Sequence, residues 1–258
     1  MTARVLLDCD GVLSDFVGGW LKLINAHHGT AWTSEDVTGW DICDSLGIKE
    51  RAKAARLLAD CPDFAANLHA YPSAVDGVHR LREIAEIYIV TSPWNSHPTW
   101  TFDREKWLKR NFDIPSSHIV HTAAKHICVG DVLVDDRTET LAKWLEHHPT
   151  GTAVQWQTPH NRRDRWNGWS TNNWDELFRI IPVRAAVRNR GCRVTDLDTV
   201  DYTILARFWP TEVWFSRVGT DAERNDWRAR TPDGGPRGIR VIAGGAVDSR
   251  DDLRGELP

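Results

Sequence analysis

The stretch that decides the fold is residues 5–16, VLLDCDGVLSDF, in which a short apolar run meets two acids and a glycine. The run from Val5 to Leu7 is typical of a buried parallel strand, and Asp8-Cys9-Asp10-Gly11 is typical of the loop that follows one. Two carboxylates at alternate positions of an extended segment project toward the same side. Because close carboxylates repel each other, the pair indicates a bound cation or a division of acid and base roles. The alternative is an Asp-Gly turn with a capping aspartate.

Outward from this stretch, the spacing of apolar residues predicts helices and strands that alternate along the chain. The expected helices cover Phe16 to His28, about Lys49 to Ala59, Ser73 to Glu86, about Phe102 to Asn111, and about Thr138 to His147. The expected later strands are Ile87 to Val90, His118 to Val120, Val132 to Val134, and Thr152 to Trp156. Such alternation predicts an α/β fold with a parallel sheet between helices. Ligands of such sheets bind beyond the carboxyl ends of the strands.

A second polar motif, Thr91-Ser92-Pro93, follows the strand expected to end at Val90. A hydroxyl beside free backbone N–H groups at a strand end can hold a phosphate oxygen. Thr-Ser-Pro is also a common turn sequence, so this motif by itself leaves both interpretations open.

A third motif combines Lys125 with Asp135-Asp136-Arg137, which ends the strand expected at Val132 to Val134. If that strand lies beside the first one, Asp135 can reach the same cation as Asp8. Lys125 could then neutralise an attacked phosphate and reduce its repulsion from a carboxylate nucleophile. The alternatives are a solvated surface lysine and an acidic helix start.

Composition and charge exclude several other classes. A formal net charge of −4 gives no reason to expect a nucleic acid polymer or an anionic membrane as partner. The five cysteines lack CxxC or finger spacing, so a disulfide framework and a zinc site are not expected. The N-terminus has no signal-peptide layout and no apolar run approaches a membrane span. We therefore expect a cytoplasmic protein.

In their order along the chain, the three motifs resemble those of the haloacid dehalogenase (HAD) phosphatases. More narrowly, DGVLSDF, Thr91-Ser92-Pro93 and the Lys-to-Asp-Asp-Arg spacing are similar to the 5′(3′)-deoxyribonucleotidases, over roughly residues 4–180. The resemblance implies a Rossmann-like catalytic core with a small helical cap inserted after the first motif. The core would comprise residues 1–15 and 72–182, and the cap residues 16–71.

The same resemblance assigns the catalytic and metal-binding roles. Asp8 would be the nucleophile and Asp10 the general acid and base. Magnesium would be held by the Asp8 carboxylate, the Asp10 carbonyl and Asp135, since hard oxygen ligands suit Mg²⁺ better than zinc. Asp136 would lie close by, as a supporting residue or an alternative ligand.

The substrate contacts implied by the resemblance are a phosphate group and a base. Three residues would bind phosphate: Thr91, Ser92 and Lys125. Aromatic rings would sandwich the base, with Phe16 and Trp40 as the candidates and Phe64 as a further one. Phe16 and Trp40 could instead belong to the core of the cap. The chain departs from the family at Trp94-Asn95-Ser96-His97, which borders the expected site.

The remaining segments are less informative. Arginines alternate with tryptophans between Thr158 and Trp174, a pattern found in nucleic-acid binding. For an acidic chain we prefer a loop that packs over the sheet edge, from which His160 and Asn161 could approach a nucleotide. Residues 183–247 are expected to form an α+β or irregular extension of unknown role. Residues 248–258 are expected to form a charged tail.

These observations lead to one main hypothesis and two alternatives. The main hypothesis is a Mg²⁺-dependent phosphomonoesterase that hydrolyses (deoxy)nucleoside monophosphates, a small-molecule substrate, through an aspartyl phosphate. One alternative is a HAD phosphatase for another small phosphomonoester, such as a sugar phosphate or a biosynthetic nucleoside intermediate. The other is a non-catalytic binding protein on a HAD core, but such a protein would be expected to lose the nucleophile, the lysine or the acidic pair, and all are present. By resemblance only, a homodimer is also expected.

Overall fold

The computed structural model describes residues 2–188. The part of the predicted extension that follows residue 188 therefore lies outside the described residues. The tail predicted from residue 248 also lies outside them. Among the described helices, none combines the length and the apolar character that crossing a membrane requires.

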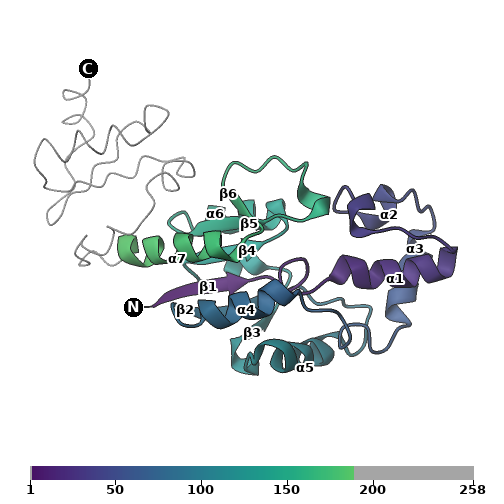
Figure 1. Ribbon diagram of the computed structural model, residues 1–258, viewed down its shortest axis with the longest axis horizontal. Coiled ribbons are helices and arrows are strands. Elements are labelled where there is room, and N and C mark those ends of the chain that lie inside the picture. The colour runs from purple at the N-terminus through teal and green to yellow at the C-terminus, as the bar shows by residue number, and fades with distance from the viewer. Residues whose placement is uncertain (1, 189–258) are drawn as a thin grey trace, which may run out of the picture. The chain divides into compact units, whose positions relative to one another are not determined.

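A six-stranded, entirely parallel sheet forms the centre of the described chain (Figure 1). The strands are β1 (Ala3–Leu7), β2 (Ala85–Thr91), β3 (Ile119–His121), β4 (Val132–Asp135), β5 (Thr152–Trp156) and β6 (Trp169–Thr171). Their order across the sheet is β3-β2-β1-β4-β5-β6, so that β1 lies between β2 and β4. The predicted α/β fold with a parallel sheet is confirmed, and the first and third motifs come from neighbouring strands.

The two faces of the sheet are covered by different helices. The helices are α1 (Phe16–His28), α2 (Ile42–Ser45), α3 (Arg51–Ala59), α4 (Pro72–Leu81), α5 (Trp100–Phe112), α6 (Thr138–His147) and α7 (Trp174–Arg188). Val5 and Leu7 belong to the larger buried cluster, which also includes side chains of α4, α5 and α7. Leu6 points to the opposite face, in a cluster with Leu141 and Trp144 of α6. Strand residues alternate between faces, and apolar residues at consecutive positions are therefore needed where both faces are covered.

Most predicted elements lie close to their expected positions. The bounds of α1, α6 and β5 are those predicted from the spacing of apolar residues. At the start of α1, the Asp15 carboxylate accepts a hydrogen bond from the Gly18 N–H, and Gly29 ends the helix with a φ of 66°. Side-chain capping at one end and a left-handed glycine at the other are strong local helix boundaries.

The helix predicted from Ser73 to Glu86 was wrong at both ends. Helix α4 begins at Pro72, whose fixed φ suits the first helical turn, and ends at Leu81. Ala85 and Glu86 instead start β2, where they pair with β1. A salt bridge of 3.1 Å between Glu86 Oε2 and Arg4 Nε joins these strands. Pairing with another strand therefore overrides local helical spacing here.

Two elements near the end of the described chain were not predicted. Strand β6 pairs with β5 at the sheet edge, inside the segment that we expected to be a loop. Three residues are too few for a recognisable alternating pattern. Helix α7 continues to Arg188, across the boundary expected at residue 182.

The segment between the first motif and α4 leaves and rejoins the sheet at one place. Asp15 N–H donates to the His69 carbonyl and Tyr71 N–H donates to the Leu13 carbonyl, both at 2.9 Å. The helices of this segment, α1 to α3, lie beyond the carboxyl end of β1 (Figure 1). A cap over the site would have to lie at this end of the sheet. The division of the cap from the core at residues 16 and 71 stays a prediction.

Gly77→Ala tests the packing of α4 against α7. An added methyl would lie 2.1 Å from the ring of buried Trp174, closer than Cβ atoms approach in real structures. Alanine gains about 1 kcal/mol over glycine in helix propensity, but overpacking costs about 1–3 kcal/mol. We expect a net loss, measured as a lower Tm in thermal denaturation. In the control Gly39→Ala, where the methyl meets only Ser45 Oγ at 3.8 Å, the Tm should hardly change; equal effects of the two substitutions would contradict this packing.

Candidate active site

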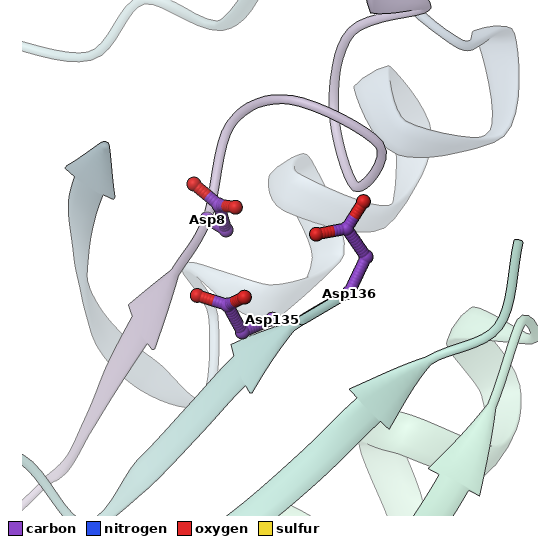
Figure 2. Close-up of side chains that lie close together, drawn as sticks. All are labelled: Asp8, Asp135 and Asp136. Carbon is purple, nitrogen blue, oxygen red and sulfur yellow. The ribbon is translucent and has the colours of Figure 1, made fainter. Parts of the chain in front are cut away.

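Three aspartates converge where β1 and β4 end (Figure 2). Asp8 follows the last residue of β1, Asp135 ends β4 and Asp136 comes next. All three are buried, and one carboxylate oxygen from each lies within 4.8 Å of the others. The first and third sequence motifs therefore meet, as expected from adjacent parallel strands.

Lys125 is the cation of this cluster. Its Nζ lies 2.7 Å from Asp8 Oδ1 and 2.7 Å from Asp135 Oδ2, and the side chain is buried. Burial alone would lower the pKa of Lys125, but Asp135 and Asp8 outweigh that effect and raise it. The ammonium therefore stays charged over the whole physiological range, and Lys125 is the residue that allows Asp8 and Asp135 to lie together.

One lysine does not neutralise the cluster. Burial raises the pKa of Asp8 from 3.8 to about 7; Lys125 opposes this rise, whereas Asp135 and Asp10 add to it. Burial also raises the pKa of Asp135 and of Asp136. Charged groups in a buried site are retained when an opposite charge compensates them. The carboxylates therefore create a strong preference for a further cation.

The glycine of the first motif is required by Asp136. Gly11 has a φ of 80°, and a Cβ built there would lie 2.1 Å from Asp136 Oδ2. The turn is closed by the Gly11 N–H, which donates to the Ser14 carbonyl at 2.9 Å. Gly11 thus supplies both a left-handed conformation and the space that the acidic pair needs.

Asp136 is held by the segment that follows β5. Its Oδ2 lies 2.9 Å from His160 Nε2, and its backbone carbonyl accepts a hydrogen bond from Asn161 Nδ2 at 2.7 Å. Both partners are buried and belong to the 3₁₀ turn Pro159–Asn161. Asp136 Oδ1 is buried and has no hydrogen-bond partner within the described part of the chain. Sequence analysis expected His160 and Asn161 near a nucleotide; the structure places both on Asp136.

Asp10 faces a buried arginine that sequence analysis missed. Asp10 Oδ1 lies 2.8 Å from Arg104 Nη2 and accepts a hydrogen bond from Ser14 Oγ at 2.6 Å. Arg104 lies on α5 between Trp100 and Trp107, on the buried face of the helix. An arginine at a core-facing helical position needs a charged partner, and this was the available sequence signal.

The second motif places one hydroxyl in the interior and one at the surface. Thr91 is buried, and its Oγ1 has no partner among the described residues. Ser92 is exposed, and its Oγ donates to the Thr122 carbonyl at 3.4 Å. A buried hydroxyl with no partner costs free energy, so Thr91 is the member of this motif that is poised for an external acceptor.

The two aromatic candidates belong to different ring clusters. Phe16 is half-buried among four rings, those of Trp20, Phe64, Trp94 and Trp100. Trp40 is 51% exposed, with the His160 ring 5.5 Å and the Arg137 guanidinium carbon 4.8 Å from its own ring. Phe16 thus packs as a core residue does, whereas Trp40 presents an accessible ring beside the partner of Asp136.

A parallel sheet of this order, with an aspartate after β1 and a lysine and an acidic pair beside it, defines a hydrolase of the HAD type. A HAD-like protein of unknown function from Agrobacterium tumefaciens str. C58 shares the fold, with a TM-score of 0.50, 16% identity, and coverage of 72% of this chain and 100% of its own. The chain belongs to the family described as 5′ nucleotidase, deoxy (Pyrimidine), cytosolic type C protein, whose model matches residues 2–188. It is accordingly a phosphoric monoester hydrolase of the 5′-nucleotidase kind.

Three proteins of similar sequence are all named as 5′(3′)-deoxyribonucleotidases. The 5′(3′)-deoxyribonucleotidase of Bacillus subtilis (strain 168) is 27% identical over 182 residues, which cover 70% of this chain and 99% of that protein. The mitochondrial 5′(3′)-deoxyribonucleotidase of Mus musculus is 27% identical over 189 residues, 68% of this chain and 84% of that protein. The cytosolic-type 5′(3′)-deoxyribonucleotidase of Homo sapiens is 26% identical over 195 residues, which cover 69% of this chain and 94% of that protein. The matched part of the chain therefore spans most of each relative.

Gly11→Ala tests the close approach of the first loop to Asp136. The methyl would strike the carboxylate and the φ would be strained, by about 1–2 kcal/mol for the conformation alone. We expect loss of phosphatase activity together with a lower Tm. Gly29→Ala is the matched control, because Gly29 has a φ of 66° but no atom within 4 Å of the added methyl. It should lose stability but keep activity, and an active Gly11→Ala enzyme would refute the steric argument.

Proposed function

We propose that this protein is a Mg²⁺-dependent phosphomonoesterase that converts (deoxy)nucleoside monophosphates to nucleoside and phosphate through an aspartyl phosphate at Asp8. The observation that carries the proposal is the contact of Asp8 with buried Lys125 at the carboxyl end of β1. A carboxylate beside a fixed cation can attack an anionic phosphate that would otherwise repel it.

The nucleophile is oriented by its hydrogen bonds. Asp8 Oδ1 accepts from Lys125 and, at 2.7 Å, from the Cys9 N–H. Within the described part of the chain no hydrogen bond reaches Oδ2, so we assign Oδ2 as the atom that attacks phosphorus. Cys9 is not a competing nucleophile, because burial raises the pKa of its thiol to about 12.

Asp10 carries the proton in both half-reactions. As the Asp8 Oδ2–phosphorus bond forms and the phosphorus–ester oxygen bond breaks, Asp10 gives its proton to the departing oxygen. Water then attacks the phosphorus of the aspartyl phosphate and gives a proton to Asp10. The bond between Asp8 and phosphorus breaks, so that phosphate is released and the Asp8 carboxylate is restored. Its side chain is 26% exposed, so Asp10 is accessible from the site.

Thr91, Ser92 and Lys125 form the proposed phosphate site. Thr91 Oγ1 is buried without a partner and can donate to a phosphate oxygen. Lys125 Nζ has two acceptors, which leaves one of its three protons for phosphate. Ser92 can turn its exposed hydroxyl from the weak Thr122 contact toward the same anion.

The residues present fit a magnesium ion. Four carboxylates, those of Asp8, Asp10, Asp135 and Asp136, face two buried cations, Lys125 and Arg104, so the site has more acidic groups than cations. All available donors are hard oxygens, as Mg²⁺ prefers. When bound, Mg²⁺ would offset this charge and polarise the phosphate.

The geometry supports one change to the ligands expected from sequence. Both oxygens of Asp135 have partners, Oδ2 accepting from Lys125 and Oδ1 from the Arg137 N–H at 2.9 Å. Asp136 Oδ1, by contrast, is unpartnered. We infer that Asp136, together with Asp8 and the Asp10 carbonyl, would hold the ion, whereas Asp135 fixes Lys125.

The nucleotide preference is supported by the family and by the names of the relatives. Trp40 is the residue most suited to stack on a base, because its ring is accessible next to His160 and Arg137. Phe16 is the weaker candidate, because its ring already packs among four others. A small-molecule substrate, a cytoplasmic location and a homodimer stay predictions; the relatives include both a cytosolic and a mitochondrial protein by name.

Phosphate release tests the proposed function directly. Ribo- and deoxyribonucleoside 5′- and 3′-monophosphates and common sugar phosphates are compared with Mg²⁺ and with EDTA. We expect Mg²⁺-dependent release from one or a few nucleotides, and Asp8→Asn should lower it by about 10³-fold or more. The matched control is Asp60→Asn, an exposed residue at the end of α3. Full release by Asp8→Asn, with deamidation excluded by mass spectrometry, would refute the mechanism; release from sugar phosphates alone would refute the nucleotide preference.

Thermal stability should report the ion without any substrate. The pKa of Asp8 is raised on folding from 3.8 to about 7, so stability of the metal-free protein falls as pH rises through this window, where the buried carboxylate ionises. Because Mg²⁺ binds the ionised form, it should raise the Tm more at about pH 7.5 than at about pH 5.5. Asp136→Asn should lose this increase. A full increase in Asp136→Asn, with loss in Asp135→Asn, would show that Asp135 is the ligand.

A further inference from the structure

Arg104 is a buried cation whose guanidinium is held from two sides by tryptophans. Its side chain is 0% exposed. The guanidinium carbon lies 4.9 Å from the ring centre of Trp100 and 5.4 Å from that of Trp107, one helical turn before and after it on α5. The indole of Trp107 is fixed in turn by donating to the Leu68 carbonyl at 2.7 Å. Arginine stacked on aromatic faces has little freedom to reorient.

The polar contacts of Arg104 all lie on the first motif. Nη2 contacts Asp10 Oδ1 at 2.8 Å, and Nη1 contacts Ser14 Oγ at 3.3 Å and Cys9 Sγ at 3.4 Å. Ser14 Oγ also donates to Asp10 Oδ1. Arg104, Ser14 and Asp10 therefore form a closed triangle in which both donors act on the same carboxylate oxygen.

This arrangement makes the two oxygens of Asp10 unequal. Oδ1 accepts from a cation and from a hydroxyl, so adding a proton there would break these bonds. Oδ2 receives no hydrogen bond from the side chains and backbone groups that the structure describes. It is therefore the oxygen on which a proton can be carried.

We propose that Arg104 is a positioning residue for Asp10, which fixes Oδ1 so that Oδ2 exchanges the proton with the leaving group and with water. This inference rests on the proposed function, because it gives Arg104 a role only if Asp10 is the general acid and base. The alternative is that Arg104 merely neutralises the Asp10 carboxylate. Neutralisation requires only a positive charge near Asp10. Positioning requires in addition that the two guanidinium nitrogens be fixed, one on Asp10 and the other on Ser14.

A double-mutant cycle tests whether Arg104 acts through Asp10. If Arg104 acts through Asp10, Arg104→Met should lower kcat for the best-cleaved nucleoside monophosphate by about 10²-fold or more, the usual contribution of a general acid or base. In an Asp10→Asn background the same change should then cost less than about 3-fold, because its effect is already lost. Equal losses in the two backgrounds would overturn the proposal, as would an Arg104→Met enzyme with wild-type kcat.

The leaving group provides a second readout that a structural role would not change. p-Nitrophenolate leaves without protonation, so Arg104→Met with p-nitrophenyl phosphate should still show a burst of about one p-nitrophenol per active site, followed by slow turnover. The nucleotide should show no such burst. Arg104→Lys, which keeps the charge without the fork, should stay impaired in kcat; full activity in it would show that charge alone suffices.

Controls distinguish failure of this inference from failure to fold or of the proposed function. Arg110→Met removes an exposed arginine from the same helix and should leave kcat unchanged. If Arg104→Met unfolds because Asp10 is left unpaired, the double variant with Asp10→Asn removes both charges, and its activity relative to Asp10→Asn decides the question. Adding Asp8→Asn to Arg104→Met should abolish the burst of p-nitrophenol. If the burst persists, the proposed function fails, whatever the other Arg104 variants do.

Discussion

The structure depends on mutual repulsion among aspartates that the fold forces together. Asp8 and the Asp135-Asp136 pair end neighbouring strands of a parallel sheet, and their oxygens meet within 4.8 Å in the interior. Lys125 offsets part of this charge by contacting Asp8 and Asp135. Burial, with smaller additions from the charges of Asp135 and Asp10, raises the pKa of Asp8 to about 7. Such a site favours either protonation of a carboxylate or the binding of a cation.

Each neighbouring feature serves to keep these charges apart or to give each one its own partner. Gly11 lacks a side chain where Asp136 approaches the first loop. His160 takes one oxygen of Asp136, and Arg104 takes one oxygen of Asp10. The carboxylates are therefore distinguished by their partners, although they are chemically identical. In the proposed mechanism, environment rather than residue type would divide the roles of nucleophile, proton carrier and ligand.

The residue that we propose for base recognition lies in a less constrained part of the chain. Trp40 lies in the segment between α1 and α2 and is half-exposed, in contact with His160 and Arg137. Glu35 of the same segment pairs with Arg162 beyond β5 at 2.7 Å. Such exposed ion pairs contribute little stability, so contacts across this boundary can open and reform at small cost. The proposed catalytic residues are thus fixed by buried charges, whereas the segment around Trp40 is joined to residues beyond β5 by weak surface contacts.

The sequence by itself determined the elements and motifs that are encoded locally. The apolar spacing of α1 and α6, the strand before Asp8, and the order of the three polar motifs all depend on residues close in the chain. Only the tertiary structure decided the partners: Arg104 with Asp10, His160 with Asp136, and Ala85 and Glu86 in a strand rather than a helix. These pairs join residues that are 24 to 94 positions apart. No local pattern specifies such a pair, because its energy exists only once the sheet has brought both members into the same buried volume.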